Sequence, residues 1–192
     1  MSKWKKIGIG AAALVVVLLI VIATRPSTYH VERSATISAS PDAVFAQVAD
    51  FKKWDAWSPW SKLDPNMKTT FDGTQGTVGA TYAWTGNDDV GEGKMTLTAV
   101  DPNKRVDIKL EFIKPFASTA QNGFKLEPAG KDTKVTWFMD GTNDFMGKAM
   151  CLVMDMDQMI GKDFEKGLAD MKKIAEAAPA QAPEAVPAAA KN

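Results

Sequence analysis

The stretch Arg105–Phe112, RVDIKLEF, decides the fold class of this chain. Apolar residues at 106, 108, 110 and 112 alternate with charged residues at 107, 109 and 111. Because successive side chains of a β-strand point to opposite faces, this pattern predicts a strand with one buried and one wet face. One wet face is typical of an antiparallel sheet, whose other face must be buried by a second layer.

Six further segments indicate strands of the same sheet. Most of them are joined by short connections rich in turn residues, such as Asp101–Lys104 and Pro128–Lys131. Short loops between successive strands predict an antiparallel meander, since parallel strands need long crossovers. The expected strands are residues 28–37, 67–71, 80–85, 93–100, 119–127 and 133–140.

Helical signals lie on both sides of these strands. Ser40-Pro41-Asp42 predicts a helix start, with Ser as the N-cap and Pro at the first position. After Gly141, apolar residues recur at threes and fours from Met146 to Ala175, the longest helical pattern outside the amino-terminal segment. Gly161 and Gly167 each cost about 1 kcal/mol relative to Ala in a helix interior, so this stretch is either one bent helix or two pieces. We expect residues 146–175 to lie across the sheet and cover its apolar face.

Composition excludes several functional classes. The 192 residues contain 23 basic and 23 acidic side chains, one His and one Cys. A net charge of zero argues against a nucleic-acid binder, which draws its affinity from a basic surface. One Cys permits no internal disulfide, and one His with one Cys cannot form the usual zinc site. We predict no metal, no cofactor and no nucleic-acid partner.

The amino end carries an apolar run, Ile7–Ala23. At 1.5 Å per residue this run spans about 26 Å, close to the thickness of a ~30 Å hydrocarbon core. Lys3, Lys5 and Lys6 precede it and only Arg25 follows closely, so the positive-inside rule predicts a cytoplasmic amino end. The sequence thus predicts a single-pass membrane protein with its domain outside the cytoplasm, in the periplasm of a Gram-negative cell.

A cleaved signal peptide is the alternative for this run. Signal h-regions are usually ~7–15 residues, which is shorter than this one, so we favour an uncleaved anchor. The predicted organisation is an anchor or signal sequence at residues 1–26, one domain at 27–175 and a disordered Ala/Pro-rich tail at 176–192, where Pro179, Pro183 and Pro187 prevent a continuous helix.

The order of elements and several short motifs resemble the SRPBCC superfamily. The motifs are Trp54–Trp60 (WDAWSPW), Ala83–Gly86, Gly91–Gly93 and Ile160–Leu168. The nearest resemblance is to the polyketide cyclase/dehydrase-like proteins, and START-type lipid-transfer domains belong to the same superfamily. The resemblance implies an α+β helix-grip fold, in which about six or seven curved antiparallel strands wrap a long carboxyl-terminal helix over a hydrophobic cavity.

Apolar side chains offer candidates for the lining of that cavity. Met side chains are flexible and polarizable, which suits a surface that repacks around varied apolar ligands, although ordinary core filling explains them about as well. Aromatic residues could supply a wall. The predicted lining residues are Trp57, Trp84, Phe112, Trp137, Met139, Met150 and Met154.

No nucleophile motif or metal-ligand spacing is present, and we predict no catalytic residue. If a general acid or base were required, Glu92 and Asp140 would be the best of the weak candidates. The predicted function is a membrane-anchored binding or transport protein for a hydrophobic small molecule or lipid. Two alternatives stay open: a cyclase/dehydrase-type enzyme that uses the same cavity, and a protein-interaction module with a filled core, whose Trp54–Trp60 patch contacts a partner. The sequence identifies no protein partner.

Overall fold

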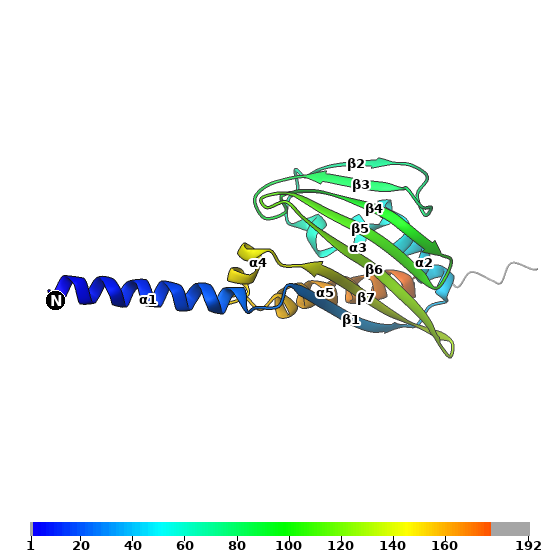
Figure 1. The fold of residues 1–192 in the computed structure, drawn as a ribbon. Helices are drawn as coiled ribbons and strands as arrows, with labels where there is room; N and C mark the ends of the chain where they lie inside the picture. Colours follow the sequence, from blue (N-terminus) through cyan, green and yellow to red (C-terminus); the bar gives the residue numbers. More distant parts are fainter. Residues whose placement is uncertain (1, 178–192) are drawn as a thin grey trace, which may run out of the picture.

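The computed structural model describes residues 2–177 (Figure 1). Within these residues, seven strands and five α-helices follow one another, with two single 3₁₀ turns, η1 and η2, on either side of α3. The elements are α1 (Lys3–Ala23), β1 (Thr28–Ile37), α2 (Pro41–Ala49), η1 (Phe51–Lys53), α3 (Trp54–Trp57), η2 (Pro59–Lys62), β2 (Lys68–Asp72), β3 (Thr81–Thr85), β4 (Glu92–Asp101), β5 (Arg105–Lys114), β6 (Ser118–Ala129), β7 (Asp132–Thr142), α4 (Phe145–Met150) and α5 (Met156–Ala177).

All seven strands form one antiparallel sheet in the order β1-β7-β6-β5-β4-β3-β2. In β5 the side chains of Val106, Ile108 and Leu110 are buried, whereas Lys109 between them is exposed. This burial follows the alternation in the sequence, because the inner face is covered by helices and the outer face meets solvent. The predicted helix-grip α+β fold is confirmed.

The local signals for α2 act as the sequence predicts. Ser40 lies outside the helix in an extended conformation, and its hydroxyl accepts a hydrogen bond from the Ala43 amide at 3.4 Å. Pro41 occupies the first turn, where no amide hydrogen is needed. Val44 and Val48 are buried, so the apolar face of α2 points into the domain.

Of the two alternatives for residues 146–175, one bent helix or two pieces, the structure has two pieces, so the helix that covers the sheet is shorter than the whole stretch. The stretch 146–175 is divided: α4 ends at Met150, and only α5, one uninterrupted helix from Met156, covers the sheet, chiefly on β1 (Figure 1). The two glycines that suggested a bend have another reason. A Cβ on Gly161 would collide with the Arg33 guanidinium, and one on Gly167 would lie 2.7 Å from the Trp137 ring. Both glycines therefore let side chains of the sheet approach the helix closely.

Among residues 2–177, α1 alone is long and apolar enough to cross a membrane, a test that a signal sequence also passes. At 1.5 Å per residue it is about 31 Å long. The helix projects from one end of the domain, and its side chains are exposed apart from that of Ile22 (Figure 1). A core helix would be buried, so α1 is no part of the domain core. From residue 178 onward, the predicted tail 176–192 lies outside the described residues.

Candidate functional site

The WDAWSPW segment, Trp54–Trp60, turns its rings into the domain. Trp54 and Trp57 are 4% and 0% exposed, and Trp60 is half-buried. Their polar edges are satisfied locally, since the Trp54 indole donates to the Val48 carbonyl at 3.1 Å and that of Trp57 donates to the Gln47 carbonyl at 3.3 Å. An exposed aromatic patch, which would favour the protein-interaction alternative, is not what this segment forms.

Trp137 on β7 is the centre of the rings that meet between the sheet and α5. Its ring stacks on Phe164 of α5, with centroids 4.1 Å apart and planes within 6°. Its indole N–H donates to Asn122 Oδ1 at 2.8 Å, which explains the one buried amide side chain on β6. We call these rings the central cluster: Trp54, Trp57, Trp60, Phe124, Trp137 and Phe164. They fill the space beneath this part of α5 with one another.

A second group of rings lines the inner face of the sheet on β2 to β5. Tyr82 stacks on Trp84 with centroids 5.8 Å apart, and Trp84 meets Phe112 edge-on at 6.2 Å. Phe71 extends the row, 5.2 Å from Tyr82. We call Phe71, Tyr82, Trp84 and Phe112 the aromatic strip. Tyr82, Trp84 and Phe112 are partly buried and Phe71 is 38% exposed, so part of this surface has no protein partner.

The backbone beside Trp84 lets its ring pack closely on β4. A Cβ on Gly93, directly across from Trp84 on β4, would collide with the indole ring, so glycine lets this ring lie flat over the strand. The indole N–H donates to the Val90 carbonyl at 3.0 Å. The polar edge is thus satisfied, and what the strip presents is apolar π surface.

The remaining predicted lining residues separate into two places. Met139, on the inner face of β7, is 5% exposed and belongs to the core beside Trp137. Met150 and Met154 are 37% and 38% exposed, at the end of α4 and in the loop after it. The structure therefore brings Trp57, Trp137 and Met139 into the core, Trp84 and Phe112 into the aromatic strip, and leaves the two α4-region methionines at the surface.

Titratable groups are sparse on the inner face of the described strands. Burial, and secondarily the charge of Asp55, raise the pKa of Tyr82 to about 12, so this phenol stays neutral and can only donate or accept a hydrogen bond. Arg33, a charged residue on the inner face, is held by two carboxylates of α5. Glu92 pairs with Lys114 at 2.8 Å where β4 begins, and Asp140 accepts from His30 Nδ1 at 2.7 Å on the outer face. Neither predicted acid-base candidate faces the aromatic rings.

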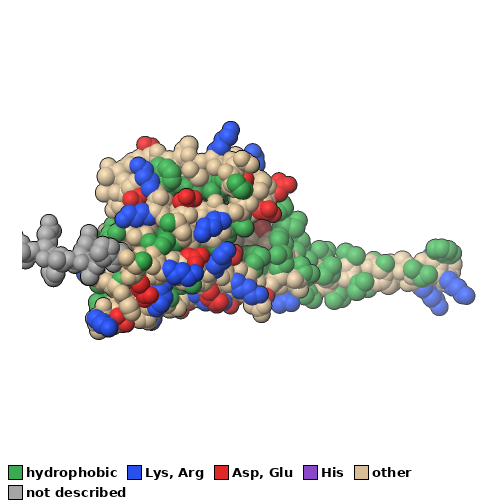
Figure 2. Space-filling view, turned by 180° about the vertical axis from the view of Figure 1, so that it is seen from behind, with side chains coloured by type: hydrophobic (Ala, Val, Ile, Leu, Met, Phe, Trp, Pro, Cys, Tyr) green, Lys and Arg blue, Asp and Glu red, His purple; other side chains and the backbone are tan. Residues whose placement is uncertain are grey.

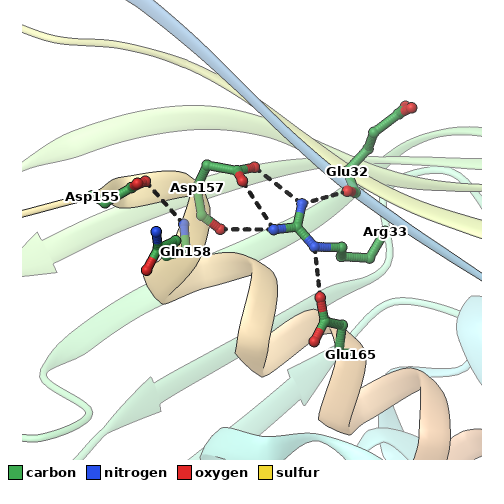
Figure 3. A network of polar contacts seen from close by, with 6 residues as sticks. All are labelled: Glu32, Arg33, Asp155, Asp157, Gln158 and Glu165. Atoms are coloured by element: carbon green, nitrogen blue, oxygen red, sulfur yellow. Dashed lines mark hydrogen bonds and ion pairs between the residues drawn. The ribbon is translucent and has the colours of Figure 1, made fainter.

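Arg33 holds α5 against β1 (Figure 3). Its guanidinium donates to both carboxylate oxygens of Asp157, at 3.0 and 2.9 Å, and to Glu165 Oε1 at 2.9 Å. It also donates to the Glu32 carbonyl at 2.7 Å and to the Asp157 carbonyl at 3.1 Å. This fork fixes the position of α5, and Gly161 leaves room for it. The carboxylates hold the pKa of Arg33 above its usual range and Arg33 lowers that of Asp157.

Two surface hollows lie away from both groups of rings. A shallow groove of about 600 Å³ runs across the outer face of the sheet, lined by Thr28, Tyr29, Thr98, Lys109, Thr119, Ala120, Gln121, Asp140, Gly141 and Thr142. A hollow of about 370 Å³ lies between the β3–β4 loop and the end of β5. Within the described residues, no cluster of three or more His, Cys, Asp or Glu side chains could hold a metal ion.

The sequence patterns did not point to Phe71, Tyr82, Arg33 or Asn122 as site residues. A signal existed for the first two, because both lie at inward positions of segments with period-two alternation. Arg33 and Asn122 gave no signal, since a lone polar residue in a strand does not say which face it occupies or what it meets there.

Comparison with known proteins places the fold in a family. Residues 28–176 match a family described as polyketide cyclase/dehydrase and lipid transport. None of the curated protein sequences matches this chain. Among solved structures, the di-domain ARO/CYC StfQ of the steffimycin biosynthetic pathway is 10% identical with a TM-score of 0.60, over 78% of this chain and 51% of that one.

Two other structures cover nearly the whole of their own chains. Ginseng major latex-like protein 151 from Panax ginseng is 14% identical with a TM-score of 0.55, over 76% of this chain and 96% of that one. Aha1 from Colwellia psychrerythraea, solved as a dimer, is 18% identical with a TM-score of 0.56, over 78% and 97%. At such low identities these similarities show the fold and nothing beyond it.

Proposed function

The chain belongs to the polyketide cyclase/dehydrase and lipid transport family of the SRPBCC superfamily, and from this premise we propose that it binds a hydrophobic small molecule or lipid. The ligand lies against the aromatic strip, and α1 anchors the protein in a membrane. The observation that carries the proposal is the row of four rings on the inner face of the sheet, of which three are partly buried and Phe71 is 38% exposed.

The chemistry of the strip supports an apolar ligand. Large aromatic side chains contribute most of the contact energy in ligand sites, and ligand pockets are mainly apolar with few polar groups. Here Trp84 and Phe112, both partly buried, supply aromatic ring surface, and the Tyr82 hydroxyl supplies a neutral polar group. Of the predicted lining residues, Trp57, Trp137 and Met139 are buried in the core and do not contact the ligand.

Binding fits the inner face better than catalysis does. A cyclase or dehydrase step needs an acid or base that reaches the reacting atom. Tyr82, with a pKa of about 12, cannot act as a base near neutral pH, and Glu92 and Asp140 are engaged in ion pairs elsewhere. The family description includes both activities, and the described inner face offers the groups that binding requires.

Photocrosslinking tests this proposal on the full chain. The protein is reconstituted in nanodiscs that contain a fatty acid with a diazirine on its acyl chain, irradiated and digested. We expect crosslinked peptides from β3 to β5. Trp84→Ala should reduce their yield by about five- to tenfold, because removing an aromatic contact worth ~1–1.5 kcal/mol weakens binding by about that factor.

Trp4→Ala is the matched control, since it removes the same side chain at the far end of α1, where Trp4 is 83% exposed. The yield of crosslinked peptides from β3 to β5 should be the same in Trp4→Ala as in the wild type. Equal labelling of the outer face and the strip, or labelling indifferent to Trp84→Ala, would contradict the proposal.

A further inference from the structure

Exposed apolar side chains gather at the end of the domain from which α1 projects. Val153 is 83% exposed and Phe116 is 66% exposed. We call this group the apolar rim; its members are Ile113, Phe116, Phe145, Met146, Met150, Val153 and Met154. Figure 2 shows hydrophobic side chains continuing from α1 onto the adjoining end of the domain.

Strand register brings the two rim segments to one end. Ala120 at the start of β6 pairs with Gly141 near the end of β7, and Thr142 pairs with Thr28 at the start of β1. The β5–β6 loop with Phe116 therefore lies on the same side as α4 and as the beginning of β1. Since β1 follows α1 after four residues, both rim segments face the direction of the anchor.

Hydrogen bonds tie the rim to the junction with α1. The Asn143 amide donates to the Ser27 carbonyl at 2.8 Å, and Lys148 Nζ of α4 donates to the Ala23 carbonyl at 3.4 Å. Helices α1 and α4 are in contact, and Ile22 near this junction is buried. The rim therefore has a fixed place beside the last turn of α1.

The short connection sets how far the rim can be from a bilayer. Residues 24–27 extend over at most ~14 Å, at about 3.5 Å per residue. The interfacial layer on each side of a ~30 Å hydrocarbon core is itself about 5–8 Å thick. The connection by itself could therefore carry the domain past this layer, and it is the contact of α4 with the last turn of α1 that keeps the rim at the headgroup region when α1 spans the bilayer.

We propose that the apolar rim inserts into the interfacial layer of the membrane that α1 crosses, so that the end of the domain that carries the rim faces the bilayer. The proposal rests on the anchoring role of α1 in the proposed function. A lipid surface is the occupant that these observations favour, because the rim is continuous with a lipid-exposed helix and held at its end. Asp144 and Asp155 in this segment accept from the amides of Gly147 at 2.7 Å and Gln158 at 3.0 Å, so both carboxylates have partners within the chain.

Depth-dependent quenching in nanodiscs of zwitterionic phospholipid tests the proposal on the full chain. In a Cys151→Ser background, which removes the single native cysteine, Val153→Cys and Phe116→Cys are labelled one at a time with bimane. A nitroxide carried on the lipid headgroup should reduce the emission at both sites about twofold or more, since interfacial segments lie ~5–10 Å deep. Lys131→Cys, in the exposed turn at the opposite end of the sheet, is the matched control and should show no quenching.

Ala13→Cys, in the middle of α1, reports on the anchor separately. Quenching at 13 by a nitroxide deep in the acyl chains, without quenching at 153 and 116, would overturn the rim proposal and leave the anchor intact. No quenching at 13 would overturn the anchoring itself, and the rim proposal with it. Quenching at 131 equal to that at 153 would show a domain lying on its side and would also overturn the proposal.

Discussion

The inner face of the sheet has two aromatic halves that differ in how completely their rings are enclosed. In the central cluster, Trp57 and Trp137 are 0% exposed and every ring meets another from a different element. In the aromatic strip, the rings also meet one another across the strands and Tyr82 meets Phe51, but the four rings keep part of their surface exposed. The difference follows from the position of α5, which packs chiefly on β1 and brings Phe164 to Trp137 and no ring to Trp84.

The comparison teaches that aromatic content alone does not locate a ligand site. A ring that is saturated by protein contacts contributes to stability, whereas a ring with free surface can contribute to binding. The same substitution should therefore lower stability much more in the central cluster than in the aromatic strip.

The largest expected effect is on stability. Trp137→Ala should lower the free energy of unfolding by about 3–5 kcal/mol, because it opens a large cavity and removes the stacking on Phe164. Trp84→Ala should cost only about 1–2 kcal/mol, since that ring is partly in solvent already. Urea unfolding of the full chain in detergent, followed by circular dichroism, measures both. Equal losses would mean that the two halves are enclosed alike.

Gly167→Ala tests the same comparison, because we expect it to change the free energy of unfolding in the direction opposite to the one that helix propensity predicts. On helix propensity alone, Gly167→Ala should stabilise α5 by about 1 kcal/mol. The new methyl group would lie 2.7 Å from Trp137 Cζ3 and 3.2 Å from Pro59 Cδ, and the closed cluster cannot yield. We expect a net loss of about 1–3 kcal/mol in the same unfolding assay.

Gly10→Ala is the control for this substitution, because nothing lies within 4 Å of the added methyl group in α1. It should leave the unfolding of the domain unchanged. A stabilised Gly167→Ala variant would show that the cluster around Trp137 is loose.

The smallest expected effect lies on the outer face, which serves as the reference for both inner halves. The hydrogen bond to Asp140 is the main cause that raises the pKa of His30 above 6.5. Because the pKa is higher in the folded state, the stabilisation is complete below about pH 6.5 and is lost as the pH rises through the folded pKa. The ring is exposed, so this contribution is on the order of a few tenths of a kcal/mol.

The single histidine makes the measurement direct. An NMR titration of the His30 ring should give a pKa above 6.5 in the wild type, returning toward that value in Asp140→Asn. An unchanged pKa in the variant would contradict the assigned cause.

Local periodicity predicted most of the fold. The expected strand 28–37 agrees with β1, and the other six expected strands agree with the structure to within about two residues at each end. Alternation works here because it reports burial, and each strand of this sheet has one covered face. The start of α2 at Pro41 was equally local, since Ser40 and Pro41 act on their own backbone.

Signals for the candidate site were weaker, because they depend on which residues meet across the fold. The sequence named seven lining residues from side-chain type. It could not separate Trp137, which α5 covers, from Trp84, which α5 leaves partly open. It also read Gly161 and Gly167 as weak points of a helix, because the Arg33 and Trp137 side chains that need the space lie elsewhere in the chain.

The sequence by itself determined the α+β helix-grip architecture, the antiparallel strands and the apolar segment at the amino end, because these depend on spacing within short stretches. Only the tertiary structure decided which aromatic rings are closed and which stay open, where the stretch 146–175 divides, and that the exposed apolar residues share the end of the domain beside α1. The physical reason is that exposure is a property of contacts between distant residues, and those contacts exist only once the sheet has paired and α5 has docked.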